Sequence, residues 1–356
     1  MPTEAVQGVP VAARRAFRLS LTTALALVIA YAMQLPLPFL APLFAILLTL
    51  KPAPPMGLKG LLKVILVVML TLSSGLLLTP LLNYYAALGI GIVALGIYFS
   101  TYLTVARENA AIIGTLLTLG ITLISAAGAA SSALSLAVIQ GIAIGIAIAT
   151  FSQWLVYPLF PEPVPPPGRQ AQAKRTAGDF NWIALRSTLI VMPVYLLVLI
   201  NPASYMPLMM KSTVLAQQVS LADAKTAGRE LLGATLLAGL LAVLIWFGLK
   251  IAVNLWMFFL WMTLFGLYIA GKFYRVLPSR HGPGFWQDVF VTLLIIIGPA
   301  VQDSANGKDV TTAFLVRMGL FLALTLYAGL AVYTLELLRE WRRPSVTPPT
   351  AHEEYT

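Results

Sequence analysis

Long apolar stretches separated by short polar connections run through the whole chain of 356 residues. Most of them approach the roughly 20 residues that a helix needs to cross the hydrocarbon core of a bilayer, and the alternating pattern of a membrane β-barrel is absent. The pattern therefore predicts an all-α membrane protein with about twelve transmembrane helices. The predicted spans are residues 17–35, 39–51, 58–82, 86–105, 109–127, 133–157, 181–200, 203–219, 226–248, 252–272, 285–302 and 311–338.

Basic residues are distributed unevenly between the two sides that these spans define. If the N-terminus is cytoplasmic, 19 of the 23 Lys and Arg residues lie on the cytoplasmic side, and only Lys250 and Lys308 lie outside. Lys and Arg are enriched in cytoplasmic loops of membrane proteins. The pattern predicts a multi-pass membrane protein with both termini in the cytoplasm; the bacterial inner membrane as its location is an expectation that follows from the resemblance described below.

A segment rich in proline and charge, Pro158 to Asp179, divides the spans into two sets of six. The predicted organisation is a first half at 1–157, a linker at 158–180, a second half at 181–338 and a tail at 339–356. Short matches recur in order, such as "FRLSL" at Phe17–Leu21 and "LRSTL" at Leu185–Leu189. Six spans in each half predict two parallel repeats, related by a pseudo-twofold axis along the membrane normal.

Composition excludes several classes of function. Charged residues make up only 10% of the chain, against about 25% in soluble domains, so the lipid bilayer is the expected surrounding. The net charge of +10 is spread over short loops and forms no patch for nucleic acid.

The chain has no Cys and only two His, which excludes the common metal motifs. In "GLYIAGKF", Phe273 replaces the Ser or Thr of a phosphate loop. Neither an enzyme nor a cofactor is expected.

The second span of each half is unusual. The first, at Pro36–Pro55, has only about 13 residues between its proline clusters, and its partner at Asn201–Gln218 is short and polar. Short or Pro-interrupted spans at matching positions in two halves point to a transport site. The second of these spans also carries Lys211, an ammonium near the middle of a span.

Lys211 and Arg317 are the two cations that fall inside predicted spans. Asp288 and Asp303 are placed toward the ends of the eleventh span, so the sequence predicts no acid at the midplane. Two unpaired cations would form a site for an organic anion, in which Arg317 grips a carboxylate and Lys211 supplies a point charge. The candidate hydrogen-bonding neighbours are Tyr205, Ser212, Thr213 and Gln217.

Structural explanations of the same residues remain open. Arg317 lies about 10 Å of helix axis from Val310, so it can extend to the interface or pair with Asp303 or Asp309. The polar second span of the second half can equally be a helix shielded within the bundle, with its hydroxyls bonded to neighbours.

The opening of the chain, "RRAFRLSLTTALALVIAYAMQLPLPFLAPLFAILLTLKP", resembles the fusaric acid resistance and aromatic acid exporter superfamily. The resemblance lies in a basic amphipathic entry, a span, a Pro-containing turn, a short second span and a terminal "KP". The large cytoplasmic domains that many members of that superfamily carry are missing, so the chain resembles a short form.

The resemblance implies an inner-membrane efflux transporter for organic acids, in particular aromatic carboxylic acids, that works with a periplasmic adaptor protein of the membrane-fusion type. Three alternatives remain open: an anion channel of the same architecture, a secondary transporter of the major-facilitator type, and a membrane scaffold that transports nothing.

Overall fold

The computed structural model describes residues 10–50, 53–107, 111–162, 177–219, 224–252, 254–305, 307 and 310–342, and these residues form helices without a strand. The first part contains α2 (Val11–Ala32), α3 (Leu40–Thr49), α4 (Leu58–Tyr84), α5 (Ala86–Ala106), α6 (Ala111–Leu119), the π-helix η2 (Gly120–Ile124), α7 (Ser125–Ala130), α8 (Ser132–Val156) and the short 3-10 helix η3 (Tyr157–Leu159). The second part contains α9 (Ala177–Ile200), α10 (Pro202–Val219), α11 (Ala224–Ile251), α12 (Leu255–Phe273), α13 (Pro283–Ala305) and α14 (Val310–Arg342).

Ten helices in the described part of the chain are long and apolar enough to cross a membrane. They indicate a multi-pass membrane protein, and they correspond to ten of the twelve predicted spans. The helix in the predicted span 39–51 is α3, whose 10 residues measure only about 15 Å at 1.5 Å per residue. The helix in the predicted span 203–219 is α10, which has 18 residues but is not among the ten apolar helices.

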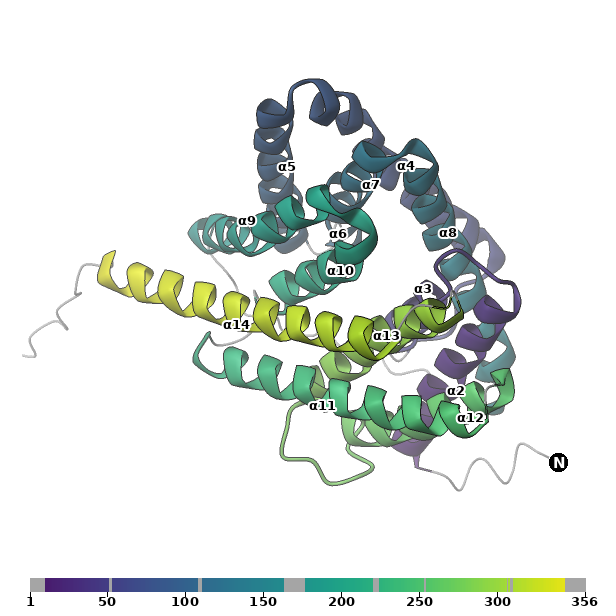
Figure 1. Ribbon diagram of the computed structural model, residues 1–356. Coiled ribbons are helices and arrows are strands. Elements are labelled where there is room, and N and C mark those ends of the chain that lie inside the picture. Colours follow the sequence, from purple (N-terminus) through teal and green to yellow (C-terminus); the bar gives the residue numbers. More distant parts are fainter. Residues whose placement is uncertain are drawn as a thin grey trace, which may run out of the picture.

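The two parts of the chain pack against each other through helix pairs in which one helix comes from each part. The first described helix, α2, packs against α12, and α5 packs against α9 (Figure 1). Hydrogen bonds join both pairs: the Ser20 hydroxyl donates to the carbonyl of Thr263 at 2.7 Å, and the Thr101 and Ser187 hydroxyls are 3.3 Å apart. These pairs place segments on opposite sides of the linker next to each other.

The remaining helices pack mainly within their own part of the chain. In the first part, α3 lies against α2 and α8, and α4 lies against η2, α7 and α8. In the second part, α10 lies against α9 and α14, and α11 lies against α13 and α14. Further contacts also cross between the parts: α13 reaches α3, α9 reaches α7, and α10 reaches η2, α6 and α7.

The crossing of α4 and η2 depends on glycine. A Cβ atom added to Gly75 would lie 1.9 Å from the carbonyl oxygen of Gly120, and one added to Gly120 would lie 2.6 Å from the carbonyl oxygen of Thr71. Helices approach this closely in membranes only where small residues face each other. The π-helical turn begins at Gly120, and such turns are rare and often occur at functional sites.

Burial separates the outer helices from the inner ones. The apolar window of α13 is 83% buried, whereas those of α4 and α14 are only 22% and 28% buried. Leu66 and Leu77 on α4 and Leu330 on α14 are largely exposed, as expected of side chains that face lipid. Of the ten long apolar helices, α13 is therefore the most enclosed.

Candidate functional site

A buried ion pair joins α10 to α13. The Nζ atom of Lys211 lies 2.7 Å from Oδ1 of Asp288 and also donates a hydrogen bond to the hydroxyl of Thr292. Lys211 and Thr292 have no solvent exposure and Asp288 is 2% exposed. A lone charge in such surroundings is very unfavourable, and the attraction between two opposite charges offsets part of the cost of burying them.

The helices explain why these three groups meet. Asp288 and Thr292 are four residues apart on α13, so they share one face of that helix. Lys211 comes from α10, which begins at Pro202 and contains Pro207, and the described contacts place α10 beside α13. The surrounding core residues, such as Val289 and Met209, are apolar and fully buried.

Part of this pair has no partner among the described residues. The Oδ2 atom of Asp288 is buried and accepts no hydrogen bond there. An ammonium has three N–H donors, and Asp288 and Thr292 accept two of them. The pair therefore has one acceptor atom and one donor free to contact a ligand.

This geometry corrects the expectation that Lys211 is an unpaired cation. Asp288 and Thr292 were missed as site residues because they lie 77 and 81 positions after Lys211 in the sequence. Because Asp288 falls toward the end of its predicted span, the sequence predicts no acid near Lys211 at the midplane. The one indication in the sequence is that Asp288 and Thr292 are four residues apart, so they share one face of a predicted helix.

The second intramembrane cation, Arg317 on α14, is also paired. Its Nη2 atom lies 2.9 Å from Oδ2 of Asp303 on α13, and the side chains are 14% and 15% exposed. This confirms the structural alternative in which Arg317 pairs with Asp303. The other alternative partner, Asp309, lies outside the described residues.

Lys211 and Arg317 are not brought together. Their partners Asp288 and Asp303 are fifteen residues apart on α13, which corresponds to about 22 Å of helix axis. With each cation within 3 Å of its carboxylate, one small organic anion cannot contact both. The joint grip by Arg317 and Lys211 expected from the sequence is therefore wrong in this structure.

The predicted hydrogen-bonding neighbours divide into two groups. Ser212 and Thr213 are buried, but their hydroxyls donate to the carbonyl of Met209 in their own helix, at 2.8 and 3.1 Å. Tyr205 is half-buried against the apolar core. Gln217 lies on α10, and its side chain is outside the described part of the structure.

A second charged cluster lies where α2 begins. The carboxylate of Glu162 accepts hydrogen bonds from Nε and Nη2 of Arg15 and, at 2.7 Å, from Nη2 of Arg18. Arg18 also donates to the carbonyl of Phe160 at 3.3 Å, and the Phe160 ring stacks on Phe17. These contacts hold residues 160–162, where the linker starts, against α2.

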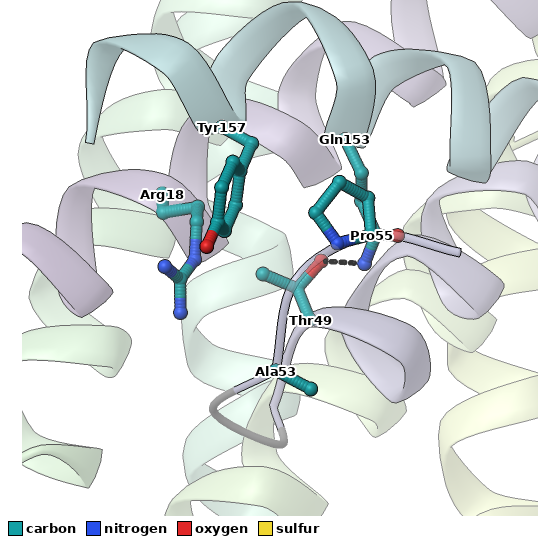
Figure 2. Close-up of a pocket in the computed structure, with 6 residues that line it drawn as sticks. All are labelled: Arg18, Thr49, Ala53, Pro55, Gln153 and Tyr157. Atoms are coloured by element: carbon teal, nitrogen blue, oxygen red, sulfur yellow. Dashed lines mark hydrogen bonds between the residues drawn. The ribbon is translucent and has the colours of Figure 1, made fainter. Parts of the chain in front are cut away.

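A small pocket of about 200 Å³, counting its open mouth, lies beside this cluster. In Figure 2 the guanidinium of Arg18 and the ring of Tyr157 are on one side and the hydrogen-bonded pair of Thr49 and Gln153 is on the other. The hydrogen bond from Gln153 Nε2 to Thr49 Oγ1 measures 2.9 Å. Ala53 and Pro55 complete the lining.

The cluster keeps Glu162 ionised. Burial by itself would raise the pKa of the Glu162 carboxyl, but the hydrogen bonds and charges of Arg15 and Arg18 outweigh it and hold the pKa below its ordinary value. Burial also raises the pKa of Tyr274 to about 12, and its hydroxyl donates to the carbonyl of Leu50 at 3.2 Å. Because Glu162 accepts hydrogen bonds from both guanidinium groups, this cluster serves to attach residues 160–162 to α2; it is called the clamp below.

Comparison with known proteins gives one match. Residues 15–155 are similar to a family described as a protein of unknown function (DUF2955), which is a membrane-protein family. The match covers less than half of the chain and ends before the linker. No curated protein and no solved structure matches the chain.

Proposed function

We propose that this protein is an inner-membrane transporter that exports organic acids, in particular aromatic carboxylic acids, as a short form of the fusaric acid resistance and aromatic acid exporter superfamily. The observation that carries the proposal is the buried pair of Lys211 and Asp288 on the helices α10 and α13. A buried ionisable group in a membrane bundle is a functional candidate by default, and an ammonium that already holds a carboxylate is chemically suited to a carboxylate ligand.

The contacts between helices support an arrangement of two parallel repeats. If α2 to α8 are paired in order with α9 to α14, the contact of α2 with α12 corresponds to that of α9 with α5. In the same way, the contact of α3 with α8 corresponds to that of α10 with α14, and the contact of α4 with η2 and α7 corresponds to that of α11 with α13. This correspondence favours a pseudo-twofold axis, and Lys211 then lies on the second helix of its repeat, where such transporters place their sites.

The position of Asp288 favours a carrier over an anion channel. A channel conducts anions past fixed positive groups and requires no titratable acid beside them. Here the candidate cation is fully buried and bound to a carboxylate at 2.7 Å. An anion replaces Asp288 as the ionic partner of Lys211 only by displacing that carboxylate, and because both side chains are buried, each anion bound in this way requires a rearrangement of the site.

The test compares flux through the wild-type protein with that through two lysine variants in proteoliposomes loaded with benzoate. Lys211→Gln is expected to reduce benzoate efflux at least tenfold. Lys250→Gln removes an exposed lysine at the end of α11 and is the matched control, with efflux unchanged. Correct folding is checked by gel filtration and by thermal unfolding in detergent.

Three outcomes would contradict the proposal. Equal efflux from Lys211→Gln and wild type would remove Lys211 from the transport path. Efflux at channel-like rates would favour the anion channel, and wild-type vesicles without any flux would favour a scaffold. A major-facilitator mechanism would not be expected to depend on the pair of Lys211 and Asp288.

An adaptor protein is part of the proposal because the connections predicted to face the periplasm are short. The connection between α4 and α5 is the single residue Tyr85, and that between α9 and α10 is Asn201. Such turns do not reach across a periplasm. Co-purification of a membrane-fusion adaptor would support the partnership, and full efflux in a host that lacks every such adaptor would contradict it.

A further inference from the structure

The free positions on the Lys211–Asp288 pair are complementary to a carboxylic acid. Oδ2 of Asp288 is buried with no hydrogen-bond partner among the described residues, and one N–H of the Lys211 ammonium remains after Asp288 and Thr292 are satisfied. A carboxylic acid offers one O–H donor and acceptor oxygens. These groups match the two open positions.

Charge balance determines what accompanies an anion into this site. Lys211 and Asp288 are 0% and 2% exposed and together carry no net charge when both are ionised. Adding a carboxylate would leave one uncompensated negative charge in an apolar interior, which is strongly unfavourable. One proton on Asp288 restores neutrality and at the same time releases Lys211 from its carboxylate.

We infer that the transporter binds each organic anion together with one proton, the ligand carboxylate replacing Asp288 at Nζ of Lys211 while the proton is held on Oδ2 of Asp288. The inference rests on the proposed function. The O–H bond formed at Oδ2 takes its proton from the ligand's own acid or from water, and Thr292 continues to accept a hydrogen bond from Lys211. One anion and one proton then move together, so transport is electroneutral.

No other charged group in the described structure substitutes for Asp288. The short helix α3 has no titratable side chain. At this end of α13, Arg229 and Glu230 on α11 are exposed, and Lys272 on α12 donates to the carbonyl of Pro278 at 2.7 Å over the ring of Tyr268. Arg186 on α9, the neighbour of α10, is buried and has a partner of its own. Arg317 on α14 holds Asp303 near the opposite end of α13.

Access to the pair requires α10 to separate from α13, because the side chains on both sides are buried. Both helices contain a proline that removes a backbone hydrogen bond, Pro207 in α10 and Pro299 in α13. Such positions allow a helix to bend. In the described arrangement Asp288 occupies the position at Nζ of Lys211 that the ligand carboxylate would take.

The test measures benzoate binding to the purified full-length protein by titration calorimetry in two buffers of different ionisation enthalpy, which counts the protons taken up. The expected result is one proton per benzoate and a Kd that rises about tenfold per pH unit between pH 6 and pH 8. The double variant Lys211→Gln, Asp288→Asn, which keeps the site neutral, is expected not to bind benzoate.

The possible failures are distinguishable. Benzoate binding without proton uptake, at a Kd independent of pH, would overturn this inference and leave the proposed function standing. No benzoate binding by the wild type would overturn both. Thr292→Val, which removes one hydrogen bond but keeps both charges, is expected to bind more weakly while still taking up one proton, and loss of that proton would also overturn the inference.

Discussion

Nη2 of Arg317 on α14 lies 2.9 Å from Oδ2 of Asp303 on α13, near the opposite end of α13 from the Lys211 pair. Both side chains keep a small exposed fraction, 14% and 15%, so this pair is less enclosed than that of Lys211 and Asp288. It joins two helices that are consecutive in the chain. Its role is expected to be structural.

Arg317→Gln is expected to lower the free energy of unfolding by about 1–3 kcal/mol, because Asp303 loses its charged partner. The double variant Arg317→Gln, Asp303→Asn is expected to recover part of this loss, since neither charge is then left alone. Thermal unfolding in detergent measures both. Additive losses in the double variant would show that the two residues are not coupled.

Glu162→Gln is expected to destabilise the end of the bundle where α2 begins, by about 3 kcal/mol, because two guanidinium groups lose their carboxylate. The effect depends on pH. The folded-state pKa of Glu162 lies below the ordinary 4.5, so its stabilisation is complete above about pH 4.5 and is lost as the pH falls through the folded-state value. Wild type and Glu162→Gln should therefore differ in melting temperature at pH 7 and converge in strong acid. An equal difference at both pH values would contradict the clamp.

Gly75→Ala is expected to cost about 3 kcal/mol or more, because its Cβ would lie 1.9 Å from a backbone oxygen of Gly120 that cannot rotate away. Gly91→Ala on α5 is the matched control, since a Cβ atom there meets nothing within 4 Å. Protein yield in the membrane and melting temperature give the measurement. A Gly75→Ala protein as stable as the control would show that α4 and η2 are farther apart.

The orientation inferred from the basic residues predicts that reporters fused after His281 and after Gly307 lie on opposite sides of the membrane. A fluorescent protein should mature after His281, in the cytoplasm, and alkaline phosphatase should be active after Gly307, in the periplasm. Activity of the same reporter at both positions would contradict an α13 that crosses the membrane.

The helices were largely predictable because a membrane span is encoded by local composition. The predicted span 58–82 corresponds to α4 at Leu58–Tyr84, and the shortness of the segment between the proline clusters predicted the 10-residue α3. The start of α2 was placed six residues too late. Its basic entry, with Arg14, Arg15 and Arg18, is also helical, and there Glu162 and nearby carbonyl groups accept hydrogen bonds from the three guanidinium groups.

The candidate site was predictable only in part. Lys211 was identified because a charge in an apolar stretch is visible in the sequence, and Asp303 was considered as a partner of Arg317 because it lies only 14 residues away. The partner of Lys211 comes from a helix 77 residues later, and hydropathy contains no information on which faces of distant helices meet. The π-helical turn at Gly120–Ile124 is likewise a result of packing against Gly75.

The contact between α2 and α12 has a consequence for synthesis of the protein. About 220 residues separate the end of α2 at Ala32 from the start of α12 at Leu255, which a ribosome adds in about 10–45 seconds. Throughout that interval the face of α2 that carries Ser20 has no α12 beside it, and during the first part of it, until residue 162 has been made, Arg18 also lacks Glu162. A helix with such a face enters the bilayer well before its partners exist, so the insertion machinery has to retain it until the second half of the chain has been made.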